Sequence, residues 1–327
     1  MRNTNLKNLA TEILCVASFL CIPAIAQTSA SKSTEQCSLA VVSRLIPSSA
    51  KVCDSATVLR LAHGGRVYEQ NQLGIASVLA IGPDFSAREA LGWFQKSAMN
   101  GYAPAQVNLA VMYANGWGSP QNYGVALRWL RAASEQHYPR AEYNLGILYM
   151  QGTGVRQDYH EAFRWFQRAA DAGDTSAQTN LGYLYDRGLG VTADAAAAVS
   201  WYTKAAKAGD PLGQYNLADM YLRGEGVAQN DAQAFSWFQK AAAKGQTGAR
   251  IKLAYMYAQG RGTKPDPEYA YSLLISASQA GDNRGRELLN SIERSLSPEQ
   301  MNGAKARAAA NSQSASAPLT TVTALAP

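Results

Sequence analysis

Apolar residues along most of this chain recur at spacings of three and four, which places them on one face of an α-helix. Residues 162–173, AFRWFQRAADAG, carry alanine, tryptophan, phenylalanine and alanine at positions i, i+3, i+4 and i+7. Residues 176–188, SAQTNLGYLYDRG, space alanine, leucine, leucine and tyrosine in a similar way. Gly173 lies between them and can adopt the left-handed conformation that ends many helices. The pattern predicts two amphipathic helices joined by a tight turn.

This helix pair recurs with a period of 36 residues. The tryptophans of the first helix are Trp93, Trp129, Trp165, Trp201 and Trp237. The leucines of the second helix are Leu109, Leu145, Leu181, Leu217, Leu253 and Leu289. Units of this size stack on one another because none of them can bury its apolar face alone. We therefore predict an all-α fold, a right-handed α-solenoid superhelix of antiparallel helix pairs, with the tryptophans in its core.

The glycine pair Gly152 and Gly154 could belong to a phosphate-binding loop, since backbone N–H groups at the start of a helix bind anions. The pair recurs, however, at 116/118, 152/154, 188/190, 224/226 and 260/262. No Gly-Lys-Ser/Thr follows any copy, and no strand pattern precedes one. We interpret the glycines as turn residues that need a positive φ.

Each glycine pair is followed by a residue type that caps helices. The capping residues, including one before the first full repeat, are Ser86, Asn122, Asp158, Asp194, Asn230 and Asp266. Glu89, Glu161 and Gln233 lie three residues after a cap, which is the spacing of a capping box. The stretches thus predict helix–turn–helix junctions rather than nucleotide sites.

The repeated blocks read Ala-x-x-Trp-Phe/Tyr/Leu-x-x-Ala-Ala/Ser, Asn-Leu-Gly/Ala and Tyr-x-x-Gly-x-Gly-Val, with Gly-Asp turns such as Gly173-Asp174. In these blocks the chain resembles the Sel-1-like repeat family, a subclass of the tetratricopeptide-like α-solenoids. The resemblance divides the chain into repeats at 90–125, 126–161, 162–197, 198–233, 234–269 and 270–296. It implies a scaffold for protein–protein interaction, regulatory or in envelope and polysaccharide processes, and not an enzyme.

Both ends depart from the pattern, as the caps of a solenoid do. Residues 54–89 fit the framework without its aromatic residues and predict a degenerate first repeat. Residues 297–309 predict a C-terminal capping helix that is out of register. Residues 310–327 are small and polar, and we expect them to be disordered.

The N-terminus has the pattern of a secretory signal peptide in residues 1–26: basic residues, an apolar run, and Ala24 and Ala26 before the expected cleavage. A retained anchor is disfavoured because the apolar run is short for a bilayer. Residues 27–53 then form an N-terminal segment with a short capping helix. We expect a periplasmic protein with no membrane span in its mature chain, and a fully secreted one is the alternative.

Two cysteines, Cys37 and Cys53, remain after removal of the signal peptide. In an oxidising compartment they predict one disulfide, and two unpaired thiols are the alternative. The formal net charge of +6 is small and scattered, which disfavours nucleic acid as a partner.

No catalytic constellation is found in the sequence. The three histidines fall at different repeat positions, and no HExxH, GxSxG, SxxK or CxxC motif occurs in the repeats 90–296. We predict no cofactor and no metal site. Some relatives in the family have been discussed as β-lactam binders, but those are built around a disulfide within each repeat, and 90–296 contain no cysteine.

In a tetratricopeptide-like superhelix, the first helix of each repeat lines a concave groove. Its polar positions here form three series. We predict that they bind another protein or peptide, such as an envelope or sensor protein. The series are Arg128 and Arg164; Gln95, Arg131, Gln167 and Gln239; and Lys96, Arg168, Lys204 and Lys240. The plain alternative is a solvated helix face. Two further functions stay open: a cell-wall or β-lactam-related enzyme or small-ligand binder, and a secreted host-interaction factor.

Overall fold

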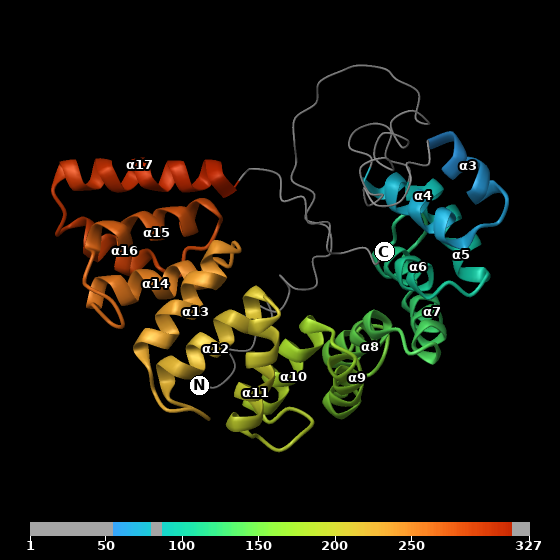
Figure 1. Ribbon diagram of the computed structural model, residues 1–327, viewed down its shortest axis with the longest axis horizontal. Coiled ribbons are helices and arrows are strands. Elements are labelled where there is room, and N and C mark those ends of the chain that lie inside the picture. The colour runs from blue at the N-terminus through green and yellow to red at the C-terminus, as the bar shows by residue number, and fades with distance from the viewer. Residues whose placement is uncertain (1–54, 80–86, 316–327) are drawn as a thin grey trace. The chain divides into compact units, whose positions relative to one another are not determined.

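A computed structural model describes residues 55–79 and 87–315 (Figure 1). Within these ranges the chain is all-helical, as predicted, and contains no strand. The helices are α3 (Ser55–His63), α4 (Val67–Leu79), α5 (Ala87–Met99), α6 (Ala103–Asn115), α7 (Tyr123–Glu135), α8 (Pro139–Gln151), α9 (Tyr159–Asp171), α10 (Thr175–Arg187), α11 (Ala195–Lys207), α12 (Pro211–Arg223), α13 (Asp231–Ala243), α14 (Thr247–Gln259), α15 (Pro267–Gln279), α16 (Arg286–Glu293) and α17 (Pro298–Ala315). The signal peptide, the segment 27–53, Cys37 and Cys53, Ser86, and the tail from 316 lie outside the described residues.

The described residues belong to two compact units, 55–133 and 134–315. Within them, first helices begin at 87, 123, 159, 195, 231 and 267, and second helices at 103, 139, 175, 211 and 247. Both sets of starts are 36 residues apart, and each helix from α5 to α15 has 13 residues. Each second helix in the larger unit, from α8 to α14, packs against the first helix that follows it. The expected right-handed superhelix stays a prediction.

The core of each repeat is filled by the residue that follows the tryptophan. Phe94, Phe166, Tyr202 and Phe238 are fully buried. A Cβ atom added to Gly146 would lie 2.6 Å from the Phe166 ring, so the second helix of one repeat leaves space for the aromatic ring of the next. Large and small side chains thus interlock between repeats.

The prediction that the tryptophans form the core is correct only for Trp93, which is buried. Trp129, Trp165, Trp201 and Trp237 are half-buried. The physical reason is their place on the helix, one residue and about 100° away from the fully buried aromatic position. Each of these indole rings is therefore at the boundary between core and solvent.

The capping residues behave as predicted, but the capping box at Glu161 does not form in the expected way. The Asp158 carboxylate accepts hydrogen bonds from the N–H groups of His160 and Glu161. The N–H of Asp158 donates to the Tyr149 carbonyl at 2.9 Å, so the cap needs no side chain from Glu161. The Glu161 carboxylate accepts from Arg164 instead, at 3.0 Å.

The other caps repeat this arrangement. Their N–H groups donate to a tyrosine carbonyl nine residues earlier, over 2.8–3.0 Å. The pairs are Asn122 with Tyr113, Asp194 with Tyr185, Asn230 with Tyr221, and Asp266 with Tyr257. The repeated tyrosine thus marks the end of the second helix, whose carbonyl fixes the start of the next repeat.

The glycine pair has two structural tasks, which Gly188 and Gly190 illustrate. Gly188 ends α10 in the left-handed conformation, with φ 64°, and its N–H donates to the Leu184 carbonyl. Gly190 has φ 70°, and a Cβ atom there would lie 2.3 Å from the carbonyl oxygen of Tyr159 in the preceding repeat. The chain needs glycine at these positions for its own backbone packing.

The C-terminal end differs from the prediction in one respect. The helix that was expected at 297–309 is α17, and it continues to Ala315, into the segment expected to be disordered. Ala310, Gln313 and Ala315 have high helical propensity, which the composition argument did not weigh. α17 packs against α15.

Candidate binding surface

Four cations lie over tryptophan rings, of which one is buried and three are half-buried. Lys96 Nζ lies 4.3 Å from the centre of the Trp93 ring in the smaller unit. In the larger unit the matching distances are 4.9 Å for Arg168 over Trp165, 3.6 Å for Lys204 over Trp201 and 3.8 Å for Lys240 over Trp237. We call the three pairs of the larger unit, on α9, α11 and α13, the tryptophan–cation ladder.

The ladder follows from helix geometry and core packing. Each cation is three residues after its tryptophan, and residues three apart are neighbours on a helix surface. Trp237 packs against the core cluster that contains Tyr202 and Leu217, which fixes its ring. A cation over an aromatic face is attracted by about 0.5–1 kcal/mol at an exposed site. The ring therefore holds the head group of Lys240 in place on the surface.

The three cations of the ladder differ in their partners. Arg168 Nη2 lies 2.7 Å from Glu142 Oε1, and the Glu142 side chain is only 3% exposed. Lys204 and Lys240 are exposed and form no ion pair with any residue that the structure describes. The helix α11 that carries Lys204 and Lys207 contains no acidic residue. The positive charges of Lys204 on α11 and Lys240 on α13 are thus available to a partner.

The other predicted site residues have more local roles. Gln95 donates to the Tyr113 hydroxyl at 2.8 Å, and Gln167 donates to Asp171 at 2.9 Å. Gln239 is hydrogen-bonded to the Tyr257 hydroxyl, which partly offsets the rise in the pKa of Tyr257 caused by burial. The glutamines of this series are therefore bonded to neighbouring side chains.

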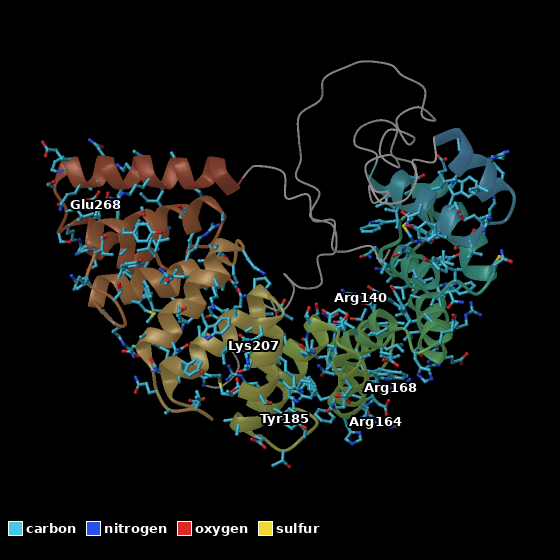
Figure 2. The ribbon with its side chains drawn as sticks, in the orientation of Figure 1. Arg140, Arg164, Arg168, Tyr185, Lys207 and Glu268 are labelled. Carbon is cyan, nitrogen blue, oxygen red and sulfur yellow. The ribbon has the colours of Figure 1, made fainter. Side chains whose placement is uncertain are left out.

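The arginine series is exposed. Arg164 pairs with Glu161 on the same helix, and Figure 2 shows it close to Arg168 on α9. Arg128 and Arg131 lie on α7 in the smaller unit, where both are exposed. The structure thus brings Arg164, Gln167, Arg168, Lys204, Gln239 and Lys240 into one unit, and Gln95, Lys96, Arg128 and Arg131 into the other.

A second charged cluster, on α10, α12 and α14, was missed in the sequence. Arg223 Nε lies 2.8 Å from Asp219, and Lys252 Nζ lies 3.0 Å from the same carboxylate. Arg223 also contacts Asp186 at 3.7 Å and Glu225. Partial burial lowers the pKa of Arg223, but Asp219 and Asp186 outweigh it and leave the pKa raised. Opposite charges separated by about one repeat were the signal that could have revealed this cluster.

Buried glutamines join the two helices within a repeat. Gln106, Gln178 and Gln214 each donate through Nε2 to a carbonyl eight residues earlier, at 3.1–3.3 Å. Glu142 takes this position in its repeat and has no N–H to donate. Glu142 pairs with Arg168 in place of the glutamine hydrogen bond, and this ion pair links α8 to α9.

Other chemistry can be placed as follows. His63, His137 and His160 are exposed, and the His63 ring makes an edge-to-face contact with Trp93 at 5.2 Å between ring centres. Burial raises the pKa of the Asp210 carboxyl, against hydrogen bonds from Thr179 and Gly213. Among the described residues no three potential metal ligands come together. None of the described helices is both long enough and apolar enough to span a membrane.

Comparisons with known proteins agree with the repeat geometry. The Sel1 repeat matches residues 80–102, 103–138, 139–174, 175–210, 211–246 and 248–282, which is more than half of the chain. The full matches begin with a second helix, whereas the repeats predicted here begin with a first helix. Among proteins with curated functions, none matches the sequence.

The solved structures that are similar to the chain include the following two. One is a protective antigen with an SLR fold present in uropathogenic Escherichia coli strains, with 32% identity and a TM-score of 0.66. The match covers 78% of this chain and 56% of the antigen, so this chain spans little more than half of its length. The other is a Sel1 repeat protein from Oxalobacter formigenes, with 35% identity and a TM-score of 0.63 over 66% of this chain and 89% of that one.

The family match, the solved relatives and the repeated helix pairs agree, and the chain belongs to the Sel1 repeat family.

Proposed function

We propose that the protein is an exported, non-enzymatic scaffold that binds an acidic partner protein through the tryptophan–cation ladder. Sel1 repeats mediate protein interactions, which supports the scaffold function. The signal-peptide pattern in residues 1–26 supports export to the periplasm. Regulation of an envelope or sensor protein, or a part in envelope polysaccharide processes, is the setting that fits such a scaffold.

One observation carries the assignment of the surface. Lys204 and Lys240 are exposed, unpaired among the described residues, and held over Trp201 and Trp237 at 3.6 and 3.8 Å. A lysine whose head group is already placed loses less side-chain entropy when it binds a carboxylate. Two such lysines at equal positions of neighbouring repeats offer a partner two fixed cation sites in a defined register.

The partner is expected to be acidic because of the charges around the ladder. Lys207 adds a further positive charge on α11, and α13 has Asp231 as its only acid, already bound by Arg261 at 2.8 Å. Complementary charges raise the rate of association and select against basic partners. We expect the exposed Arg164 to extend this basic surface in the larger unit, and Arg128 to offer a separate basic site in the smaller unit.

The experiment is a crosslinking capture from periplasmic extract with the purified mature protein as bait. The test variant is Lys204→Glu with Lys240→Glu. The matched control is Lys305→Glu with Arg307→Glu, which changes the charge by the same amount at exposed positions of α17. The proposal predicts a partner that is captured by the wild type and the control but lost with the ladder variant. Equal capture by both variants would remove the ladder as the binding surface.

A further inference from the structure

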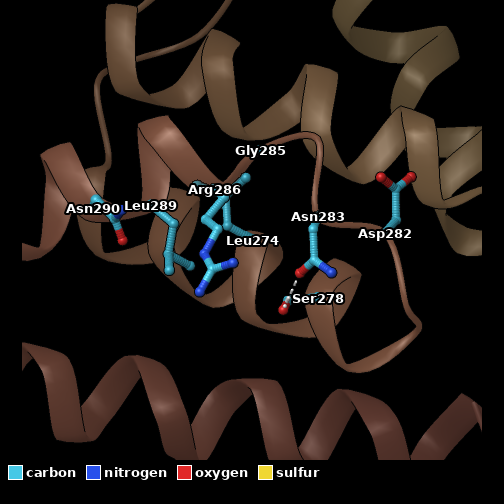
Figure 3. A pocket seen from close by; sticks show the side chains of 8 residues that line it. All are labelled: Leu274, Ser278, Asp282, Asn283, Gly285, Arg286, Leu289 and Asn290. Carbon is cyan, nitrogen blue, oxygen red and sulfur yellow. Dashed lines mark hydrogen bonds between the residues drawn. The ribbon is translucent and has the colours of Figure 1, made fainter.

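The last helix pair of the repeat region, α15 and α16, borders a cavity of about 380 Å³ that is open to solvent (Figure 3). It is lined by Leu274 and Ser278 of α15, by the turn at 282–285, and by Arg286, Leu289 and Asn290 of α16. Small-molecule sites in proteins begin at about 300 Å³. The cavity is therefore large enough for one amino-acid side chain and its terminal group.

The cavity exists because no further repeat covers α16. In the five preceding repeats the second-helix leucine is fully buried, but Leu289 is only half-buried. The aromatic ring of the next repeat normally covers this place, as Phe166 covers Gly146 and Tyr202 covers Gly182. Here the next helix, α17, packs against α15 instead. The cavity thus lies where the aromatic side chain of a following repeat would lie.

The polar groups of the cavity offer hydrogen-bond donors. The guanidinium of Arg286 forms no ion pair or hydrogen bond with any residue that the structure describes, and Figure 3 shows it beside Leu274 and Leu289. Asn283 accepts from the Ser278 hydroxyl at 2.9 Å through its oxygen, which leaves its NH₂ group for a ligand. Asn290 adds a second amide. A guanidinium with two neighbouring amides is suited to a carboxylate.

Asp282, the one acidic residue that lines the cavity, does not repel a bound anion. Asp282 is bound by the Arg284 side chain through two hydrogen bonds, at 2.6 and 2.9 Å. Figure 3 shows its carboxylate turned away from Arg286. The charge that remains free in the cavity is therefore positive.

We propose that this cavity binds a carboxylate that carries an aromatic side chain, as at the C-terminus of a peptide that ends in phenylalanine. The ring lies against Leu274 and Leu289, where the earlier repeats hold an aromatic ring. The carboxylate pairs with Arg286 and accepts from Asn283 or Asn290. This site is separate from the tryptophan–cation ladder and does not depend on it.

The test is a fluorescence anisotropy titration of the purified protein with fluorescein-Gly-Gly-Gly-Phe, as the free acid and as the C-terminal amide. A charge-assisted contact predicts that the acid binds about tenfold more tightly or better. Arg286→Gln should abolish this preference. Arg294→Gln, an exposed charge outside the cavity lining, should leave it unchanged. Asn290→Phe, which fills the cavity from within, should abolish binding of both peptides.

Equal affinity for acid and amide, an unchanged preference in Arg286→Gln, or no binding at millimolar peptide would overturn the proposal. Circular dichroism of each variant shows that lost binding is not lost folding. Competition by N-acetylphenylalanine would extend the site to any aromatic carboxylate, and competition by peptides alone would restrict it to peptide termini. Lys204→Glu with Lys240→Glu should leave peptide binding intact, so this test fails or succeeds independently of the ladder.

Discussion

Removal of the Arg168 side chain is the most informative single perturbation of the repeat stack. Glu142 is nearly buried, and its carboxylate depends on Arg168 at 2.7 Å. Removing one partner of a buried ion pair lowers the free energy of unfolding by about 3–5 kcal/mol, because the other charge is left buried and unpaired. The Arg168 side chain is 45% exposed, so water relieves part of that cost. We expect Arg168→Ala to lower the free energy of unfolding by about 2 kcal/mol.

Two matched variants separate the ion pair from the other contacts of Arg168. Lys204→Ala also removes a cation from a tryptophan, but no acid depends on it, so it should cost about 1 kcal/mol or less. Arg168→Ala with Glu142→Gln should recover most of the loss. Glutamine is the residue found at the equivalent positions 106, 178 and 214, where it donates to a carbonyl eight residues earlier.

The assay is urea unfolding followed by circular dichroism at 222 nm, with all three variants and the wild type measured together. A loss in Arg168→Ala no larger than that in Lys204→Ala would show that the Glu142 pair adds nothing to stability. A double variant as unstable as Arg168→Ala would refute the reasoning that the unpaired carboxylate is the cause.

Three further outcomes are expected from the same unfolding assay. Gly190→Ala should lower the free energy of unfolding by several kcal/mol, because its Cβ would lie 2.3 Å from a carbonyl oxygen. Gly173→Ala, with φ 91° and open space, should lower it by only about 1–2 kcal/mol through backbone strain. Equal losses in the two variants would contradict the packing argument. Phe166→Ala should lower the free energy of unfolding by about 3–5 kcal/mol and Trp165→Ala by clearly less, since only Phe166 is fully buried. The reverse order would show that the tryptophan is the core residue. Burial raises the folded-state pKa of Asp210 above 3.8, so this carboxyl favours folding at low pH and loses that contribution as pH rises through the folded pKa. Asp210→Asn should therefore gain stability relative to the wild type as the pH rises from about 4, and a difference that does not change with pH would contradict this.

The 36-residue spacing of caps, glycines and leucines predicted the helix pairs and their junctions because these features depend on local backbone chemistry. The exposure of the tryptophans could not be predicted in the same way. Trp165 and Phe166 are adjacent, and a helical period does not decide which of two neighbouring aromatics points inward. The decision is made by Gly146 in the preceding repeat, whose missing side chain admits Phe166.

The candidate surface was predicted in part. The sequence predicted Lys204 and Lys240 as exposed cations. Their positions over the Trp201 and Trp237 rings were not predicted, because the tryptophans were expected in the core. The pairing of Glu142 with Arg168 joins residues 26 positions apart and breaks the repeat pattern, so periodicity hides it. The cavity beside Arg286 depends on where α17 packs, which no periodic signal contains.

The central claim is that the lysines of the ladder carry the binding of an acidic partner. Isothermal titration of the captured partner against the wild type, Lys204→Glu with Lys240→Glu, and Lys305→Glu with Arg307→Glu tests it most directly, at low and at high salt. The account predicts that the wild type and the α17 variant bind alike and weaken with salt, while the ladder variant binds at least about tenfold more weakly at low salt. Equal affinity of the ladder variant and the wild type at low salt would contradict it.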